Sequence, residues 1–170
     1  MTGLRLTDGA LASGAWHTLW TGHLMHYGFE HFLWDALIFA SFSLLLWKEE
    51  RWRLWAWLLI SPPILSLVVF TVHPALTEYR GLSAVDTMLF ARYFLGSFRV
   101  LGGWQRWAFA ALPLVALLAK IGFEFATGNA LFVGGMGPGV VPLPSAHAAG
   151  ALLGLLWFTL HSPARPTESH

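Results

Sequence analysis

The chain has 170 residues, of which 56% are hydrophobic and only 11% are charged. A soluble domain carries about 25% charged residues, so this chain has too few charges for a water-exposed surface of its size. The net charge of +1 gives no basis for nucleic-acid binding, and the absence of cysteine excludes disulfides and thiol chemistry. The composition therefore indicates an integral membrane protein.

The chain begins with a short polar stretch and continues with five long apolar segments. Residues 1–14 are small and polar and lack the apolar core of a signal peptide. Each apolar segment is close to the roughly 17 to 25 residues that a helix needs to cross a bilayer. The segments cover residues 31–47, 54–72, 82–98, 104–125 and 144–161. We therefore predict an all-α, polytopic membrane helix bundle in which residues 1–170 form a single domain.

The second segment contains two consecutive prolines, Pro62 and Pro63. Proline has no backbone N–H, so each one leaves a carbonyl in the preceding turn without its helical donor. The pair predicts a kinked membrane helix whose freed carbonyls are satisfied by neighbouring groups.

Basic residues divide unequally between the two ends of these segments. The richer end holds Lys48, Arg51, Arg53, Arg92, Arg99, Arg106 and Arg165, and the other end holds Arg5, Arg80 and Lys120. Because basic residues are enriched in cytoplasmic loops, the richer end is expected to face the cytoplasm. The N-terminus and the loops 72–82 and 125–144 then face outward, and residues 162–170 form a cytoplasmic tail.

Ser83 is the first candidate for chemistry. It lies in the only Gly-x-Ser of the chain, at the outer start of the third segment. Backbone N–H groups in the first turn of a helix lack an intrahelical partner, and the helix dipole is positive there. Such donors beside a hydroxyl can hold a developing oxyanion, so the pattern is typical of a nucleophilic serine. A helix N-cap serine fits the same pattern.

His147 is the second candidate, at the outer start of the fifth segment. Small residues stand four apart around it, at Ala146, Gly150 and Gly154. This spacing allows two helices to approach closely in lipid. A histidine at the end of such a face can reach a hydroxyl on the neighbouring helix and act as its base. A packing motif with an interfacial histidine is the alternative.

Further ionisable residues lie within predicted membrane segments, where such groups are costly and often functional. His31 and Asp35 are four residues apart and therefore share one helix face. They either present two polar groups to one cavity or consist of an interfacial histidine and an aspartate bonded to another helix. Asp86 is three residues after Ser83, and it either orients part of the site or pairs with a neighbouring polar group.

A metal site is conceivable but not predicted. His17, His23, His26 and His31 form a loose cluster, and a His-x-x-His spacing can bring two imidazoles together. No carboxylate or cysteine stands at a recognisable zinc spacing from them. We therefore expect no metal and no cofactor.

Taken together, these residues resemble the rhomboid family of intramembrane serine proteases. The family pattern is a His, a His-x-x-x-Asn, a Gly-x-Ser-Gly and a His-x-x-Gly-x-x-x-Gly on successive helices. Its counterparts here are His26, His31 with Asp35, Gly81-Leu82-Ser83-Ala84, and His147 with Gly150 and Gly154. The resemblance spans roughly residues 16–158. It is closest to the rhombosortase branch of small bacterial rhomboids, because of residues 21–26, 79–83 and 141–144 and of Lys120 with Glu124 and Gly128.

The resemblance implies a serine endopeptidase in the bacterial inner membrane, with its active site facing the periplasm. Ser83 would attack a peptide carbonyl and His147 would take its proton, without a third acidic member. His31 and Asp35 would help the Ser83 backbone N–H to stabilise the oxyanion, with Gly81, Asp86, Gly150 and Gly154 in support. The implied partners are membrane-anchored proteins with a C-terminal sorting tail, made of a Gly-rich motif, an apolar span and a basic end.

Three positions depart from the family pattern. Asp35 replaces an asparagine, and an ionised carboxylate would repel an oxyanion, so it is expected to be protonated or to orient His31. Ala84 replaces a glycine and adds a methyl group at a tight helix contact. The family's first helix has no counterpart, and residues 1–22 correspond to the end of the loop that follows it.

Three other functions are considered. An inactive rhomboid-like protein would bind membrane helices without cutting them, and Asp35, Ala84 and the absent helix favour it. A membrane phosphatase of the type-2 phosphatidic acid phosphatase family is suggested by the sequence of residues 144–147, but the arginines that would clamp the phosphate are lacking. A channel or transporter is disfavoured because there is no internal repeat and the polar groups gather near one face.

Overall fold

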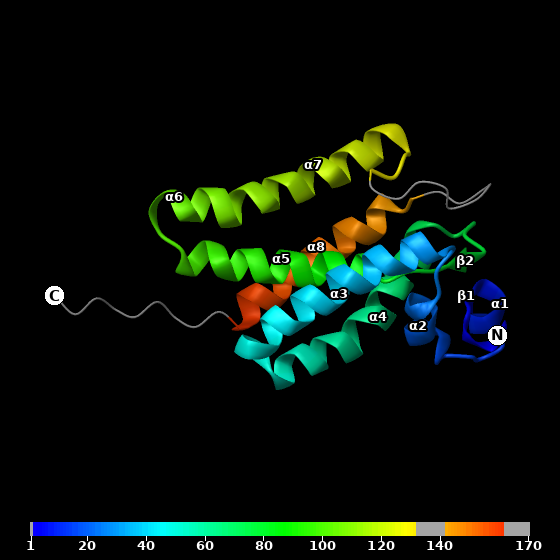
Figure 1. Cartoon of the computed structure of the whole chain (residues 1–170). Coiled ribbons are helices and arrows are strands. Elements are labelled where there is room, and N and C mark those ends of the chain that lie inside the picture. Colours follow the sequence, from blue (N-terminus) through cyan, green and yellow to red (C-terminus); the bar gives the residue numbers. More distant parts are fainter. Residues whose placement is uncertain (1, 132–141, 162–170) are drawn as a thin grey trace.

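The computed structural model describes residues 2–131 and 142–161 and is mostly helical, as the all-α prediction requires (Figure 1). The long helices are α3 (Phe29–Glu50), α4 (Trp52–Val72), α5 (Ser83–Val100), α7 (Leu112–Thr127) and α8 (Pro144–His161). The shorter elements are η1 (Thr2–Leu4), β1 (Leu6–Thr7), α1 (Asp8–Ala12), α2 (Thr18–Thr21), η2 (Gly22–Leu24), β2 (Glu78–Tyr79), α6 (Gly103–Arg106) and the π-helical turn η3 (Trp107–Ala111). The predicted cytoplasmic tail, Arg165 and the middle of the loop 125–144 lie outside the described residues.

Within the described residues, three helices are long and apolar enough to cross a membrane. They are Phe29–Glu50, Trp52–Val72 and Gly103–Thr127, the last of which runs through α6, η3 and α7. They contain the predicted segments 31–47, 54–72 and 104–125. The other two predicted segments form α5 and α8, which are 18 residues long and are not among these three helices. The described part of the chain is therefore a helical bundle with three helices of membrane-spanning character.

Helix α5 is less apolar because it lies at the centre of the bundle and is enclosed by other helices. Figure 1 shows α6 and α7 on one side of α5, and α3 and α4 on the other. Its buried residues include the apolar Val85, Met88 and Leu89 and the polar Asp86 and Arg92. The guanidinium of Arg92 is paired with the carboxylate of Glu50. A helix surrounded by protein can carry such groups without exposing them to lipid.

Helices α5 and α8 pack closely because glycines stand at their contact. A Cβ atom added at Gly150 would lie 2.1 Å from the carbonyl oxygen of Ala84, and one added at Gly154 would lie 2.5 Å from that of Met88. Both positions exclude any side chain, as expected where small residues four apart let two backbones approach. The paired residues advance together along both helices, so α5 and α8 run parallel and begin at the same end of the molecule.

The prolines of α4 lie inside the helix, and a neighbouring side chain compensates for one missing N–H. Pro63 cannot donate to the carbonyl of Leu59, and the indole N–H of Trp20 donates to that oxygen over 2.7 Å. On the same side, the hydroxyl of Ser66 donates to the carbonyl of Leu19. The proline-containing part of α4 is thereby attached to α2, which belongs to the N-terminal segment.

Residues 1–22 were predicted to be the remnant of an outer loop, and their described part contains short helices and strand β1. Strand β1 pairs antiparallel with β2, with Leu6 opposite Tyr79, and the Leu6 side chain is fully buried. Gly22 allows the close approach, because a Cβ atom there would lie 2.3 Å from Leu6 Cβ. The N-terminal segment therefore fixes the position of β2, which leads directly into the loop before α5.

His23 joins this segment to both α4 and the loop before α5. Its Nδ1 is 3.2 Å from the carbonyl oxygen of Gly81, and its Nε2 is 3.0 Å from both the carbonyl oxygen of Pro62 and Ser66 Oγ. The side chain is buried. Burial disfavours the charged imidazolium and lowers the pKa of His23 to about 4.

Acidification is therefore expected to destabilise the protein through His23. Between pH 6.5 and 4 the unfolded state binds a proton at His23 that the native state does not, so the free energy of unfolding falls as pH is lowered through this window, by roughly 2–4 kcal/mol. Thermal unfolding in detergent at several pH values measures the slope, and His23→Gln should reduce it. The matched control is His17→Gln, because the His17 side chain is exposed. An unchanged slope in His23→Gln would contradict the assignment.

Candidate functional site

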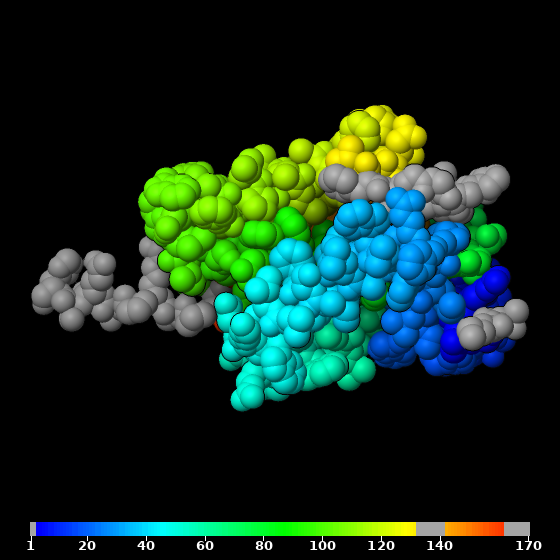
Figure 2. All heavy atoms as spheres, viewed as in Figure 1, coloured from blue at the N-terminus to red at the C-terminus, as the bar shows by residue number. Residues whose placement is uncertain are grey.

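A cavity of about 780 Å³ opens at the end of the bundle where α5 and α8 begin. Figure 2 shows the surface above α5 recessed between α3 and α7. The cavity brings together polar residues from four helices: His31 and Asp35 of α3, Ser83 and Asp86 of α5, Lys120 and Glu124 of α7, and His147 of α8. The two residues predicted to be catalytic and the two predicted to orient them therefore line one cavity, together with apolar side chains such as Trp34 and Phe90.

Ser83 is the first residue of α5 and follows a glycine in a strained conformation. Gly81 has φ +111°, and a Cβ atom there would lie 3.0 Å from His31 Cε1 and 3.3 Å from Asp35 Oδ2. Only glycine combines this backbone conformation with so close a contact to α3. The N-cap of α5 is Leu82, so Ser83 is not an N-cap serine. Among the described residues, its hydroxyl has no hydrogen-bond partner, and it is half-buried at the cavity wall.

Ser83 and His147 start neighbouring parallel helices at similar heights. Ser83 is one residue before Ala84, and His147 is three residues before Gly150, which lies opposite Ala84. The two side chains therefore differ by two residues in level, about 3 Å along the helix axis at a rise of 1.5 Å per residue. No hydrogen bond between them is present among the described residues. The arrangement puts hydroxyl and imidazole at the same end of one tight helix contact.

His147 also contacts a carboxylate to which sequence reasoning gave no catalytic role. Its Nδ1 is 2.6 Å from Glu124 Oε2, and Lys120 Nζ is 2.6 Å from Glu124 Oε1 and 3.2 Å from the same Nδ1. The Glu124 side chain is 2% exposed. The sequence does contain a pattern that could have indicated Glu124 as a site residue. Lys120 and Glu124 are four residues apart in an otherwise apolar segment and share a helix face.

Asp35 acts as a hydrogen-bond acceptor for the loop that precedes Ser83. Its Oδ2 accepts from the backbone N–H of Leu82 over 2.9 Å and lies 3.2 Å from His26 Nε2 and 3.3 Å from His31 Nε2. These contacts match the orienting role considered for Asp35. They also make His26, His31 and Asp35 one cluster that fixes the position of Gly81 and Leu82.

The remaining candidate residues are placed as follows. Asp86 is buried at the cavity wall, and neither of its carboxylate oxygens has a hydrogen-bond partner among the described residues, so the expected pairing with a neighbouring polar group is not found there. His17 contacts the carbonyl oxygen of Gly3, and His23 contacts the carbonyl oxygen of Gly81 in the loop before α5. The described residues contain no group of three or more His, Asp or Glu side chains arranged to hold a metal ion.

A second serine–histidine pair lies close by. His73 Nε2 is 2.7 Å from the hydroxyl of Ser145, which joins the end of α4 to the first turn of α8. Neither residue lines the large cavity. Their hydrogen bond therefore connects two helices, and Ser145 provides a natural control for experiments on Ser83.

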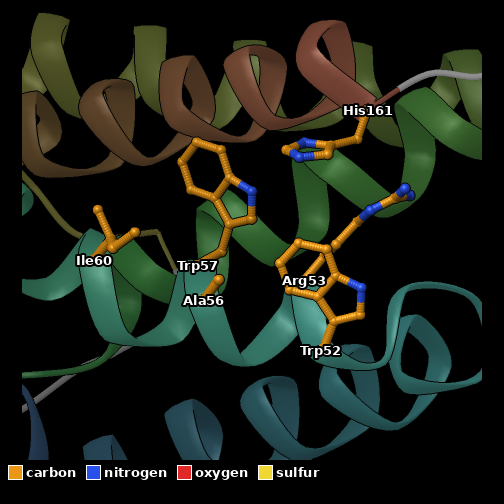
Figure 3. A pocket seen from close by; sticks show the side chains of 6 residues that line it. All are labelled: Trp52, Arg53, Ala56, Trp57, Ile60 and His161. Atoms are coloured by element: carbon orange, nitrogen blue, oxygen red, sulfur yellow. The ribbon is translucent and has the colours of Figure 1, made fainter.

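A smaller pocket of about 230 Å³ lies at the opposite end of the bundle, between α4 and the end of α8 (Figure 3). Its lining consists of Trp52, Arg53, Ala56, Trp57, Ile60 and His161. It contains neither a serine nor a carboxylate. The grouping of a serine, a histidine and carboxylates is thus found in the larger cavity.

Substitution of Asp35 by asparagine is expected to keep activity within about tenfold of wild type, because the amide oxygen can still accept from Leu82 N–H. Asp35→Ala leaves that buried N–H without an acceptor, which costs about 1–3 kcal/mol and disorders the approach to Ser83. Cleavage of a membrane-anchored reporter protein, the activity that the rhomboid resemblance implies, and thermal unfolding in detergent measure both effects. The control is Asp8→Asn, at an exposed position of α1. Complete inactivity of Asp35→Asn would mean that the carboxylate itself is required.

Comparison of the chain with protein-family models, with curated proteins and with solved structures finds no significant match. A free hydroxyl at a helix N-terminus, an imidazole whose Nδ1 faces a carboxylate, and a cavity with apolar walls together suit nucleophilic attack on a carbonyl carbon.

Proposed function

We propose that this chain is an intramembrane serine endopeptidase of the rhomboid type, and that within this type it is rhombosortase-like. The observation that carries the proposal is the shared cavity of Ser83 and His147 at the start of two helices in tight parallel contact. The contact of His147 Nδ1 with Glu124 supports it, because this contact leaves Nε2 available to the hydroxyl. The resemblance of the sequence to rhomboids supports the same assignment.

In the proposed reaction, Ser83 Oγ attacks the carbonyl carbon of a substrate peptide bond while His147 Nε2 takes the hydroxyl proton. The tetrahedral intermediate collapses when the imidazolium gives this proton to the leaving amine, which frees the C-terminal fragment and leaves an acyl ester on Ser83. A water molecule, deprotonated by His147, then hydrolyses the ester and restores the serine. The cavity is open enough for that water to enter.

The oxyanion would be held mainly by backbone groups. The N–H groups in the first turn of α5, at Ser83 and Ala84, have no partner within the helix, and the helix dipole adds positive potential there. Asp35 Oδ2 accepts from the backbone N–H of Leu82 and lies within 3.3 Å of the Nε2 atoms of His26 and His31. We assign it to positioning the loop and His31, and not to contact with the oxyanion.

The proposed membrane arrangement has five crossings, with α5 and α8 as the two inner helices. Figure 1 shows the turn between α3 and α4, helix α6 and the end of α8 at one end of the bundle, and the N-terminal elements at the other. Lys48, Arg51, Arg99 and Arg106 belong to the first end, which we assign to the cytoplasm. In a bacterial inner membrane the cavity would then face the periplasm. Its proposed substrates are proteins anchored by a C-terminal apolar tail with a basic end.

The test uses purified protein in liposomes with a reporter that carries a Gly-rich motif, an apolar span and a basic tail. Release of the reporter's outer domain is the expected result, and the matched reporter without the apolar span should remain intact. Binding of the reporter without cleavage would overturn the protease and favour the inactive rhomboid-like protein. That alternative has one specific observation in its favour, because no Ser83–His147 hydrogen bond is present among the described residues.

A further inference from the structure

We propose that Glu124 is a positioning residue that fixes the tautomer of His147, and that Lys120 pairs with Glu124 without setting that tautomer. This inference rests on the proposed function and deepens it, because it adds an acidic member where the resemblance implies a two-residue dyad. The residues concerned come from two helices, α7 and α8, that meet beside the cavity.

The geometry defines an ordered chain of contacts. Lys120 Nζ is 2.6 Å from one oxygen of Glu124, and the other oxygen is 2.6 Å from His147 Nδ1. All three residues line the same cavity as Ser83. The Glu124 side chain is almost completely buried, so water cannot replace the imidazole as its partner. A buried carboxylate needs such partners, and both of its oxygens have one.

The contact selects one tautomer of the imidazole. A carboxylate only accepts hydrogen bonds, so Nδ1 must carry the hydrogen that points at Glu124, and Nε2 then carries the lone pair that a general base needs. Lys120 competes for the same nitrogen, because its ammonium lies 3.2 Å from Nδ1 and would donate to it. Donation from Lys120 would require the opposite tautomer, in which Nε2 bears a hydrogen and cannot take the Ser83 proton.

The shorter distance and the charge pattern favour Glu124. A contact of 2.6 Å is short for a hydrogen bond and typical of a charged partner, whereas 3.2 Å is at the long limit. The Lys120 ammonium also has the carboxylate itself as a nearer partner. Lys120 therefore balances the negative charge of the Glu124 carboxylate, and Glu124 orients the imidazole of His147.

A purely structural link between α7 and α8 would use the same contacts, so the test must separate packing from chemistry. Glu124→Gln keeps the shape of the side chain, but its amide can either accept from Nδ1–H or donate to Nδ1. It should lower kcat for reporter cleavage by about 10²- to 10⁴-fold with KM changed less than about threefold, by analogy with loss of the orienting acid in a serine protease triad. Glu124→Asp should recover at least about tenfold of this loss.

The second readout does not depend on proteolysis. In a Ser83→Ala background, ¹⁵N spectra of the histidine side chains should report the Nδ1–H tautomer for His147, with the signal assigned by its absence in His147→Gln. Glu124→Gln should convert this signal into a mixture of tautomers, and Lys120→Met should leave it unchanged.

The results distinguish a failure of the Glu124 proposal from a failure of the proposed protease function. A kcat for Glu124→Gln within about threefold of wild type, or an unchanged tautomer, would overturn the role of Glu124. If a folded Glu124→Gln protein cannot be obtained, the tautomer of the Lys120→Met variant decides, because an Nε2–H tautomer there would overturn the proposal and Nδ1–H would support it. If Ser83→Ala cleaves the reporter normally, the proposed protease fails, whereas the tautomer measurement still decides what Glu124 does to His147.

Discussion

Substitution of Ser83 by alanine is expected to lower kcat for reporter cleavage by at least about 10⁴-fold, because the nucleophile is removed while the helix start is kept. His147→Ala should cause a loss of similar size, since the two groups act as a unit and their effects do not add. Cleavage in liposomes measures both losses. A fluorophosphonate that forms a covalent adduct with activated serines should label the wild type and spare Ser83→Ala.

The matched control is Ser145→Ala, which removes a second hydroxyl near the same end of the bundle. Ser145 bonds to His73 and lies outside the large cavity. Its loss should reduce stability modestly, by about 0.5–1.5 kcal/mol for one hydrogen bond, and leave labelling intact. Undiminished cleavage by Ser83→Ala, or loss of labelling in Ser145→Ala, would remove Ser83 from the role of nucleophile.

Substitution of Gly150 by alanine is expected to impair folding and activity together. The added methyl group would lie 2.1 Å from the carbonyl oxygen of Ala84, which is backbone and cannot rotate away. The helices must separate, and overpacking of this kind costs about 1–3 kcal/mol or more. Because Ser83 and His147 lie at the end of this contact, separation should also reduce kcat. Thermal unfolding in detergent and reporter cleavage, measured on the same preparation, test the two effects.

Gly122→Ala serves as the control on α7. A Cβ atom at Gly122 meets no atom within 4 Å, so the substitution should be neutral or stabilise the helix by about 0.5–1 kcal/mol. Equal behaviour of the two variants would show that the α5–α8 contact is looser than the structure requires. A stable but inactive Gly150→Ala protein would indicate that helix spacing matters for catalysis more than for folding.

Much of the fold could be predicted from the sequence because its determinants are local. The long apolar segments predicted where the helices lie. The four-residue spacing of Gly150 and Gly154 indicated the face on which α8 meets another helix. The five-span prediction is supported by apolarity for only three helices. Charged residues such as Arg92 lower the apolar character of α5, and their burial depends on which helices surround it, which no local pattern specifies.

The details of the site depend on pairings between distant segments. Glu124 meets His147 across 23 positions of the chain, and Asp35 reaches the N–H of Leu82 across 47. Sequence reasoning singled out Asp35 as a departure from a family pattern, but its contacts with His26, His31 and the Leu82 N–H depend on the fold. It assigned residues 1–22 to an outer loop from the family resemblance, and the pairing of two residues of β1 with β2 leaves no periodic signal in the sequence.

That pairing has a consequence for how the protein should be handled. Leu6 pairs with Tyr79 across the two strands, and the ring of His23 contacts the carbonyl oxygen of Gly81. The N-terminal segment therefore restrains the stretch of chain that leads to Ser83. Affinity tags, truncations or protease nicks placed near residue 6 would therefore affect the position of Ser83 from outside its cavity. Preparations tagged at the two ends of the chain should be compared before low activity is attributed to any residue of the site.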